Sequence, residues 1–153
     1  MLYKFPHLPQ PVKGAKMSKT SEDPKPPSHL RVTIDGETRE IFMSFGLTNE
    51  IAHLVGGVEG IPDLSFNQTT AMAALELVLA RRDKRGNILP PAEGEDPVVP
   101  YNLDPEVAEE ILDWAGNHAL DFFVRQFAKQ AARFATKAGK LAEVGSSLTS
   151  SAS

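Results

Sequence analysis

The fold is decided by residues 104–144, DPEVAEEILDWAGNHALDFFVRQFAKQAARFATKAGKLAEV, which form the longest helical pattern in the chain. Asp104 can accept hydrogen bonds from the first free backbone N–H groups of a helix, and Pro105 suits the first helical position. The pattern therefore predicts a helix that begins at Asp104 and runs to about Val144. If continuous through Gly116, it would be roughly 60 Å long at about 1.5 Å per residue, more than one small core can cover.

Apolar residues recur along this helix at steps of three and four, which places them on one stripe. They are Leu120, Phe123, Phe127, Ala131, Phe134, Ala138 and Leu141. Such a stripe is stabilised only when it packs against another element. It predicts either a core contact within the chain or a surface that binds a second protein. Trp114 adds aromatic area to the same helix, and truncating a buried aromatic residue typically costs about 3–5 kcal/mol.

Charge is divided unevenly along the 153-residue chain, whose formal net charge is −4. Residues 87–124 contain acidic residues but no Lys or Arg, whereas Arg125, Lys129, Arg133 and Lys137 follow at steps of four. Acid near the start of a helix and base near its end complement the helix dipole. The basic row can also steer an acidic partner or follow the phosphates of a nucleic acid, and the overall acidity of the chain favours the protein partner.

The segment before this helix predicts a small hairpin and two short helices. Asp35-Gly36 separates two β-prone runs, residues 30–34 and 38–43, and Asp-Gly favours a hairpin turn. Residues 44–55 predict a helix that stops at Gly56-Gly57. Ser65 and Gln68 have the spacing of a capping box, which predicts a second helix up to about Arg82. Two groups should be buried, the hairpin face Val32, Ile34, Ile41 and Met43 and the helix side Met72, Leu75, Val78 and Leu79.

The expected fold class is mainly helical (α+β): a small N-terminal hairpin packed on two short helices and one long C-terminal helix. Residues 1–28 are rich in Pro and Lys and predict an extended arm, in which Met17 is a second candidate for the start of translation. Residues 29–144 form the domain, and the proline-rich, acidic segment 87–103 should cross its surface. The Ser-rich residues 145–153 predict a flexible tail.

Chemistry-bearing motifs point away from catalysis. The chain has no Cys, so it has no disulfide or thiolate site, and its four His residues lack the spacing of metal ligands. No serine sits in a Gly-x-Ser-x-Gly turn, and no glycine-rich phosphate loop occurs. No apolar run approaches the ~20 residues that cross a bilayer. We therefore expect a non-enzymatic protein with no catalytic residues, no metal, no cofactor and no membrane partner.

The order of the segments resembles that of the tail assembly chaperones of long-tailed bacteriophages. The order is a short hairpin, IFMSFGLTNEIAHLVGG (residues 41–57), a second helix ending in LARRDKRGNI (residues 79–88), an acidic proline-rich loop, and EVAEEILDWAGNHALDFFVRQF (residues 106–127). The resemblance covers roughly residues 30–135 and rests on residues 43–55 and 111–127. It implies a helper that acts in the host cell cytoplasm during assembly. Such a helper holds the helical tape-measure protein in solution and recruits tail tube subunits.

This interpretation assigns two kinds of site residue. The partner contacts, or the residues that support them, are Trp114, Phe123, Phe127 and Phe134, and the steering charges are Arg125, Lys129 and Arg133. Two other functions fit the same sequence: a permanent structural subunit of the phage particle, in tail or capsid, whose arms clamp neighbouring subunits, and a small DNA-binding helical module. A homo-oligomer is compatible with each of these three functions.

Overall fold

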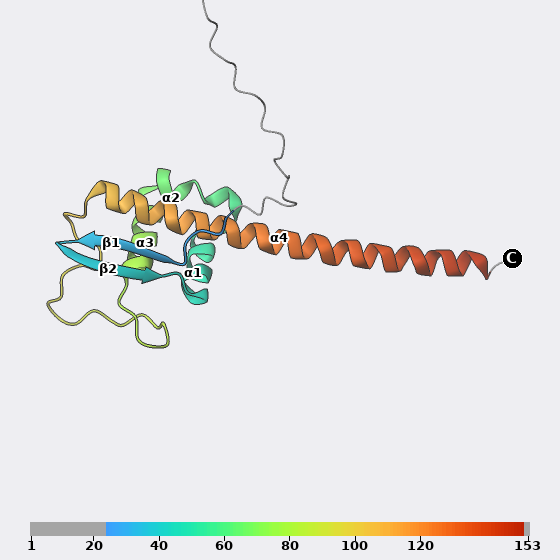
Figure 1. Cartoon of the computed structure of the whole chain (residues 1–153), viewed down its shortest axis with the longest axis horizontal. Helices are drawn as coiled ribbons and strands as arrows, with labels where there is room; N and C mark the ends of the chain where they lie inside the picture. Colours follow the sequence, from blue (N-terminus) through green and yellow to red (C-terminus); the bar gives the residue numbers. More distant parts are fainter. Residues whose placement is uncertain (1–23, 152–153) are drawn as a thin grey trace, which may run out of the picture.

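The structure is a computed structural model that describes residues 24–151. It is mainly helical with one two-stranded sheet, as predicted (Figure 1). Its elements are β1 (His29–Ile34), β2 (Glu37–Phe42), α1 (Phe45–Val55), the 3₁₀ turn η1 (Val58–Gly60), α2 (Asp63–Phe66), α3 (Gln68–Leu79) and α4 (Pro105–Ser150). The predicted amino-terminal arm lies outside the described residues, except for positions 24–28.

The hairpin forms where the Asp-Gly pair predicted it. β1 and β2 are antiparallel and pair from His29 opposite Phe42 to Ile34 opposite Glu37. Asp35 (φ 53°) and Gly36 (φ 79°) both adopt positive φ, the pattern of a type I′ turn, whose twist matches that of the flanking strands. The predicted inner face contributes to the core: Val32 and Ile34 of β1 and Met43, directly after β2, are buried, and Ile41 is partly buried.

The limits of α1 confirm the predicted range and the predicted stop at Gly56. The Ser44 hydroxyl accepts a hydrogen bond from the Leu47 N–H (3.1 Å), which satisfies one of the free donors at the helix start. Gly56 ends the helix in the left-handed conformation (φ 77°), where its N–H donates to the Ala52 carbonyl. Leu47 and Ile51 then face the core.

The predicted capping box of α3 is wrong. Ser65 lies inside the short helix α2, and the cap is Asn67, whose side-chain oxygen accepts from the N–H groups of Thr69 (3.0 Å) and Thr70 (3.2 Å). Asn is as good a cap as Ser, and Asn67 is extended (φ −112°, ψ 110°), which separates the two helices. The sequence alone did not reveal this break.

The carboxyl end of α3 also differs from the prediction, since the helix stops at Leu79 and not at Arg82. Ala80 is extended, and the Arg82 side chain turns back to donate to the Leu77 carbonyl (2.9 Å) at the helix end. The same guanidinium pairs with Glu50 of α1 (2.6 Å). A cation that satisfies a free carbonyl at the end of a helix stabilises that end, so Arg82 caps α3 and does not extend it.

Met72 is wrongly predicted to be buried, since 49% of it is exposed. The buried side of α3 consists of Ala74, Leu75, Val78 and Leu79. Ala74 is completely buried, which allows the backbone of α3 to approach its neighbours closely. Met72 lies instead on the side of α3 that faces the loop after it.

The core lies where the first part of α4 meets the other elements. From α4 it receives Ile111, Trp114, Ala115 and Ala119, which pack with residues of β1, α1, α2 and α3. Figure 1 shows that α4 then continues beyond these elements as a single rod. The predicted polar loop crosses the surface, since residues 87–98 are all exposed.

The predicted flexible tail is helical up to Ser150. No break occurs at Gly116, so α4 is one continuous helix that extends past the expected end at Val144. Its last hydroxyl groups bond back to carbonyls of the preceding turn, for example from Ser147 to Val144 (2.9 Å) and from Thr149 to Gly145 (3.1 Å). No helix within residues 24–151 combines the length and hydrophobicity that crossing a bilayer requires.

We predict that Gly60→Ala destabilises the domain. A Cβ atom at position 60 would lie 1.8 Å from the Val55 carbonyl oxygen, a backbone atom that moves only if the connection between α1 and α2 moves. By analogy with overpacked cores, the free energy of unfolding should fall by about 1–3 kcal/mol in urea denaturation. Gly46→Ala is the control, because the nearest atom to its Cβ would be 3.9 Å away. Equal stability of both variants would contradict the prediction.

Candidate partner-binding surface

The carboxyl-terminal part of α4 lies apart from the domain. Phe123 is the last α4 residue that packs against the core, and it is only partly buried. From Val124 to Ser150 every residue of the helix is exposed. The helix therefore presents all of its sides along this length, including its apolar side.

A regular apolar row runs along this exposed rod. We call it the α4 seam, and its residues are Leu120, Val124, Phe127, Ala131, Phe134, Ala138, Leu141, Gly145 and Leu148. Phe127 is 64% exposed and Phe134 71% exposed. The residues follow one another at alternating steps of four and three, which is the heptad spacing of helices that pair as coiled coils. An isolated domain rarely exposes a continuous apolar row of this length, so the seam is a candidate docking surface.

The predicted site residues fall into different environments. Phe127 and Phe134 lie on the seam, whereas Phe123 lies where the rod leaves the domain. The sequence interpretation missed Val124, Gly145 and Leu148. A signal for Leu148 was present, because Leu120, Phe127, Phe134, Leu141 and Leu148 are spaced by seven, but the expected tail hid the end of the series.

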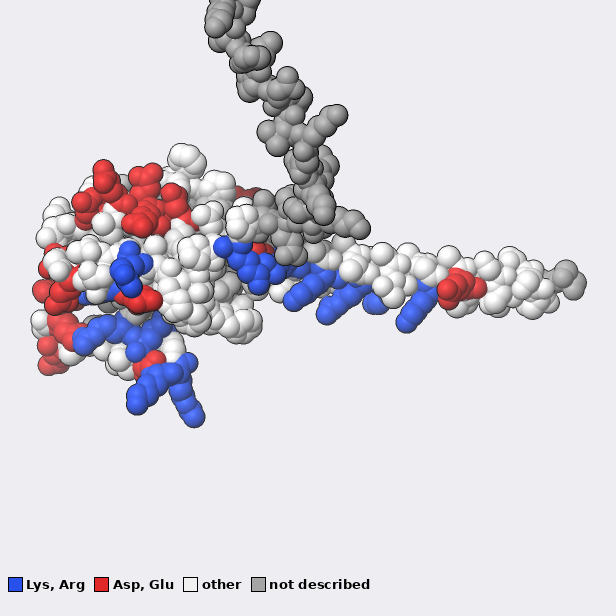
Figure 2. Space-filling model, in the orientation of Figure 1, with Lys and Arg blue, Asp and Glu red and all other residues white. Residues whose placement is uncertain are grey.

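The predicted steering charges form a basic row on the rod. Figure 2 shows Lys and Arg side chains gathered along one side of the helix beyond the domain. In the heptad, Arg125, Lys129 and Arg133 occupy positions outside the seam. The Arg125 Nε donates to Asp121 (2.8 Å) one turn earlier, a pair that stabilises an exposed helix by only about 0.3–0.5 kcal/mol. These cations lie on the side of the rod away from the apolar row and do not interrupt it.

Trp114, also predicted as a partner contact, lies in the core. It is 4% exposed, and its indole Nε1 donates to the Pro27 carbonyl oxygen (2.7 Å). His118, one turn later, bonds the same oxygen through Nε2 (2.9 Å), and the two rings meet edge to face with centroids 5.1 Å apart. A carbonyl oxygen only accepts, so His118 must carry a proton on Nε2. Of the two roles predicted for Trp114, contact or support, we assign support: it ties the start of β1 to α4.

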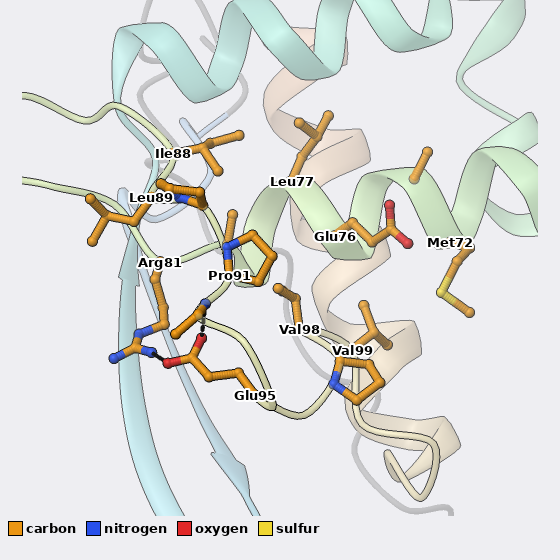
Figure 3. Close-up of a pocket in the computed structure, with 15 residues that line it drawn as sticks. Met72, Glu76, Leu77, Arg81, Ile88, Leu89, Pro91, Glu95, Val98 and Val99 are labelled. Atoms are coloured by element: carbon orange, nitrogen blue, oxygen red, sulfur yellow. Dashed lines mark hydrogen bonds and ion pairs between the residues drawn. The ribbon is translucent and has the colours of Figure 1, made fainter.

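A second apolar surface lies beside α3. A groove of about 990 Å³ is bounded by Met72 and Leu77 of α3 and by the loop residues Ile88, Pro91 and Val98 (Figure 3). Its rim carries Glu95, which accepts from the Ala92 N–H (3.2 Å) and pairs with Arg81.

The hydrogen bond from the Ala92 N–H is the main reason why the pKa of Glu95 lies below its ordinary value, and the Arg81 guanidinium is the second. Both interactions favour the charged form of the carboxylate. Figure 3 shows the Glu95 carboxylate directed toward Arg81. The carboxylate thus ties the loop to the segment directly after α3, and the groove offers mainly apolar contacts.

Within residues 24–151, no group of three or more His, Asp or Glu side chains is placed so that it could hold a metal ion. Comparisons with protein-family models, with curated proteins and with solved structures found no significant match.

We predict that Trp114→Phe loosens the link between α4 and the start of β1. The substitution keeps an aromatic ring in the core but removes the bond to Pro27, which should lower the free energy of unfolding by about 1 kcal/mol. Amide exchange should also become faster at Met43, whose N–H donates to the Ser28 carbonyl (2.8 Å). Phe66→Leu, an aromatic change at a residue of α2 that is 87% exposed, is the control and should alter neither quantity. Unchanged exchange at Met43 in Trp114→Phe would refute the link.

Proposed function

We propose that this chain is a non-enzymatic protein that binds a helical segment of another protein along the α4 seam. The observation that carries the proposal is the exposure of Phe127 and Phe134 on a helix that has left its own domain. An amphipathic helix presents apolar anchors to a partner at steps of three and four, and the seam has this spacing. The domain formed by β1 to α3 then serves as the base that holds the start of α4.

The resemblance described above makes the proposal more specific: a tail assembly chaperone of a long-tailed bacteriophage. Its partner would be the tape-measure protein, a long helical protein whose apolar stripes require cover before they are packed into a tail. The α4 seam would provide that cover in the host cell cytoplasm, and tail tube subunits would be recruited to the complex. The exposed length of the rod supports this role, since helix pairing needs several successive turns.

The basic row would speed the encounter with an acidic partner. Arg125, Lys129 and Arg133 follow at intervals of about one turn on the side of the rod away from the seam, so they would attract an acidic partner from a distance without contacting a helix docked on the seam. Exposed charges of this kind affect association rate and specificity more than affinity. Binding should therefore slow as ionic strength rises.

The main alternative is a permanent structural subunit of the phage particle, for which an exposed rod between neighbours is equally suitable. Mass spectrometry of finished particles separates the two functions. A chaperone is absent from the particle, whereas a structural subunit is present in it at a fixed number of copies. We expect the chain to be absent.

We predict that the double variant Phe127→Ala/Phe134→Ala loses its partner but keeps its fold. Both side chains are exposed, so their truncation removes little packing within the chain, and the domain formed by β1 to α3 and the start of α4 should keep its unfolding transition. Affinity should fall by at least about tenfold, since hot-spot aromatic residues typically contribute 2 kcal/mol or more to binding. The measurement is co-purification of the tape-measure protein from infected cells.

The matched control for this experiment is Thr136→Ala, which lies on the rod outside the seam and is also exposed. It should retain the partner. If the double variant still retains the tape-measure protein, the seam is not the binding surface. If the double variant unfolds, Phe127 and Phe134 belong to a core.

A further inference from the structure

We infer that, before a partner binds, the α4 seam pairs with the seam of a second copy of this chain as an antiparallel coiled coil. The inference rests on the proposed function in that both assign helix packing to the same surface. The sizes and charges of the seam residues favour a second copy as the first occupant of this surface.

The two sets of core positions in the heptad differ in size. One set holds the large residues Leu120, Phe127, Phe134, Leu141 and Leu148. The other set holds the smaller residues Val124, Ala131, Ala138 and Gly145. When two seams pair, the direction of the partner helix decides whether a large residue faces another large residue or a small one.

A parallel pair would place identical residues opposite each other. Phe134 would meet the partner's Phe134, and Ala138 would meet the partner's Ala138, so crowded layers would alternate with empty ones. In an antiparallel pair the large set of one helix faces the small set of the other. Cores pack best when large and small residues alternate across facing positions, so this seam is self-complementary only in the antiparallel direction.

One antiparallel register matches every layer between Leu120 and Gly145. It is centred between Ala131 and Phe134, and its layers pair Phe134 with the partner's Ala131, Phe127 with the partner's Ala138, Leu141 with the partner's Val124, and Leu120 with the partner's Gly145. By the twofold symmetry of the pair each layer occurs twice. The two domains then lie at opposite ends of the paired rods, clear of each other.

The residues that flank the seam do not oppose this pairing. On one side they are Ala128, Ala135 and Ala142, and on the other they are Phe123, Gln130, Lys137 and Val144. In the register above, Lys137 lies near the partner's Gln130, so no like charges face each other across the seam. Like charges at these flanking positions are a common means of preventing self-pairing in coiled coils, and this helix lacks them.

The paired surface is also large enough for a stable dimer. From Leu120 to Leu148 the rod is about 42 Å long at about 1.5 Å per residue. The two Phe side chains of each copy bury on the order of 150 Å² each. Together with the aliphatic seam residues of both copies, the buried area reaches the range of about 1,200 Å² at which stable interfaces begin. A partner helix would have to displace the second copy, so self-pairing protects the seam until the partner is present.

Disulfide trapping tests the direction and the register, because the chain has no Cys of its own. Val124→Cys and Leu141→Cys are purified separately and then mixed under mild oxidation. We expect a cross-linked dimer in the mixture and none in either variant alone. In the proposed register, identical positions are about 25 Å apart along the axis at about 1.5 Å per residue, too far for a disulfide. If each variant cross-links when it is alone, the pair is parallel. If no sample cross-links, the proposed register is wrong. Either outcome overturns the inference.

Sedimentation equilibrium of the full chain tests the dimer itself. Wild-type protein should be dimeric, and Phe134→Asp should raise the dimer dissociation constant on the order of a hundredfold, because it places an unpaired charge in the seam. Thr136→Asp adds the same charge outside the seam and should remain dimeric. A monomeric wild-type chain that still binds the tape-measure protein overturns the dimer and leaves the proposed function standing. A dimer that binds no phage protein supports the inference and overturns the proposed function.

Discussion

The structure depends on the burial of one short apolar face of α4 against α1, α2 and α3. Ile111 and Ala115 are completely buried, and Trp114 and Ala119 extend the same face. The two alanines allow close approach of the neighbouring helices, while Trp114 supplies the bulk and a hydrogen bond that reaches back to the chain before β1. All of this packing lies in the first part of the helix, so it orients α4 and leaves the rest of it without a neighbour.

The division of α4 into a packed part and an exposed part is what makes the chain a candidate for assembly. An exposed helix of ordinary polar composition would be a spacer, but this one repeats large apolar residues every seven positions. Helix propensity alone makes a long single helix marginal in water, so its stability should depend on what covers the seam. A second copy and a partner helix both meet that requirement, and competition between them would link partner binding to release of the self-paired form.

Much of the fold was predictable because its signals are local. Asp35-Gly36 indicated the hairpin, Ser44 and Gly56 indicated the limits of α1, and Asp104 with Pro105 indicated the start of α4. Two of the errors arose where tertiary contacts hold a residue in another place. Arg82 reads as part of a helix, yet Glu50 and the Leu77 carbonyl draw its side chain back and α3 ends before it. Met72 has the spacing of a buried residue, but the completely buried Ala74 occupies the side of α3 that faces the core.

The sequence by itself determined the hairpin, the range of α1, the start of α4, the heptad spacing along α4 and the separation of acidic from basic charge, since each depends on residues near one another along the chain. Only the tertiary structure decided which aromatic residues are available to a partner. Trp114, Phe127 and Phe134 all lie on one helix, but the domain is just large enough to cover the first of them. Burial depends on how far the other elements reach along α4, and that distance is set by packing between segments far apart in the sequence.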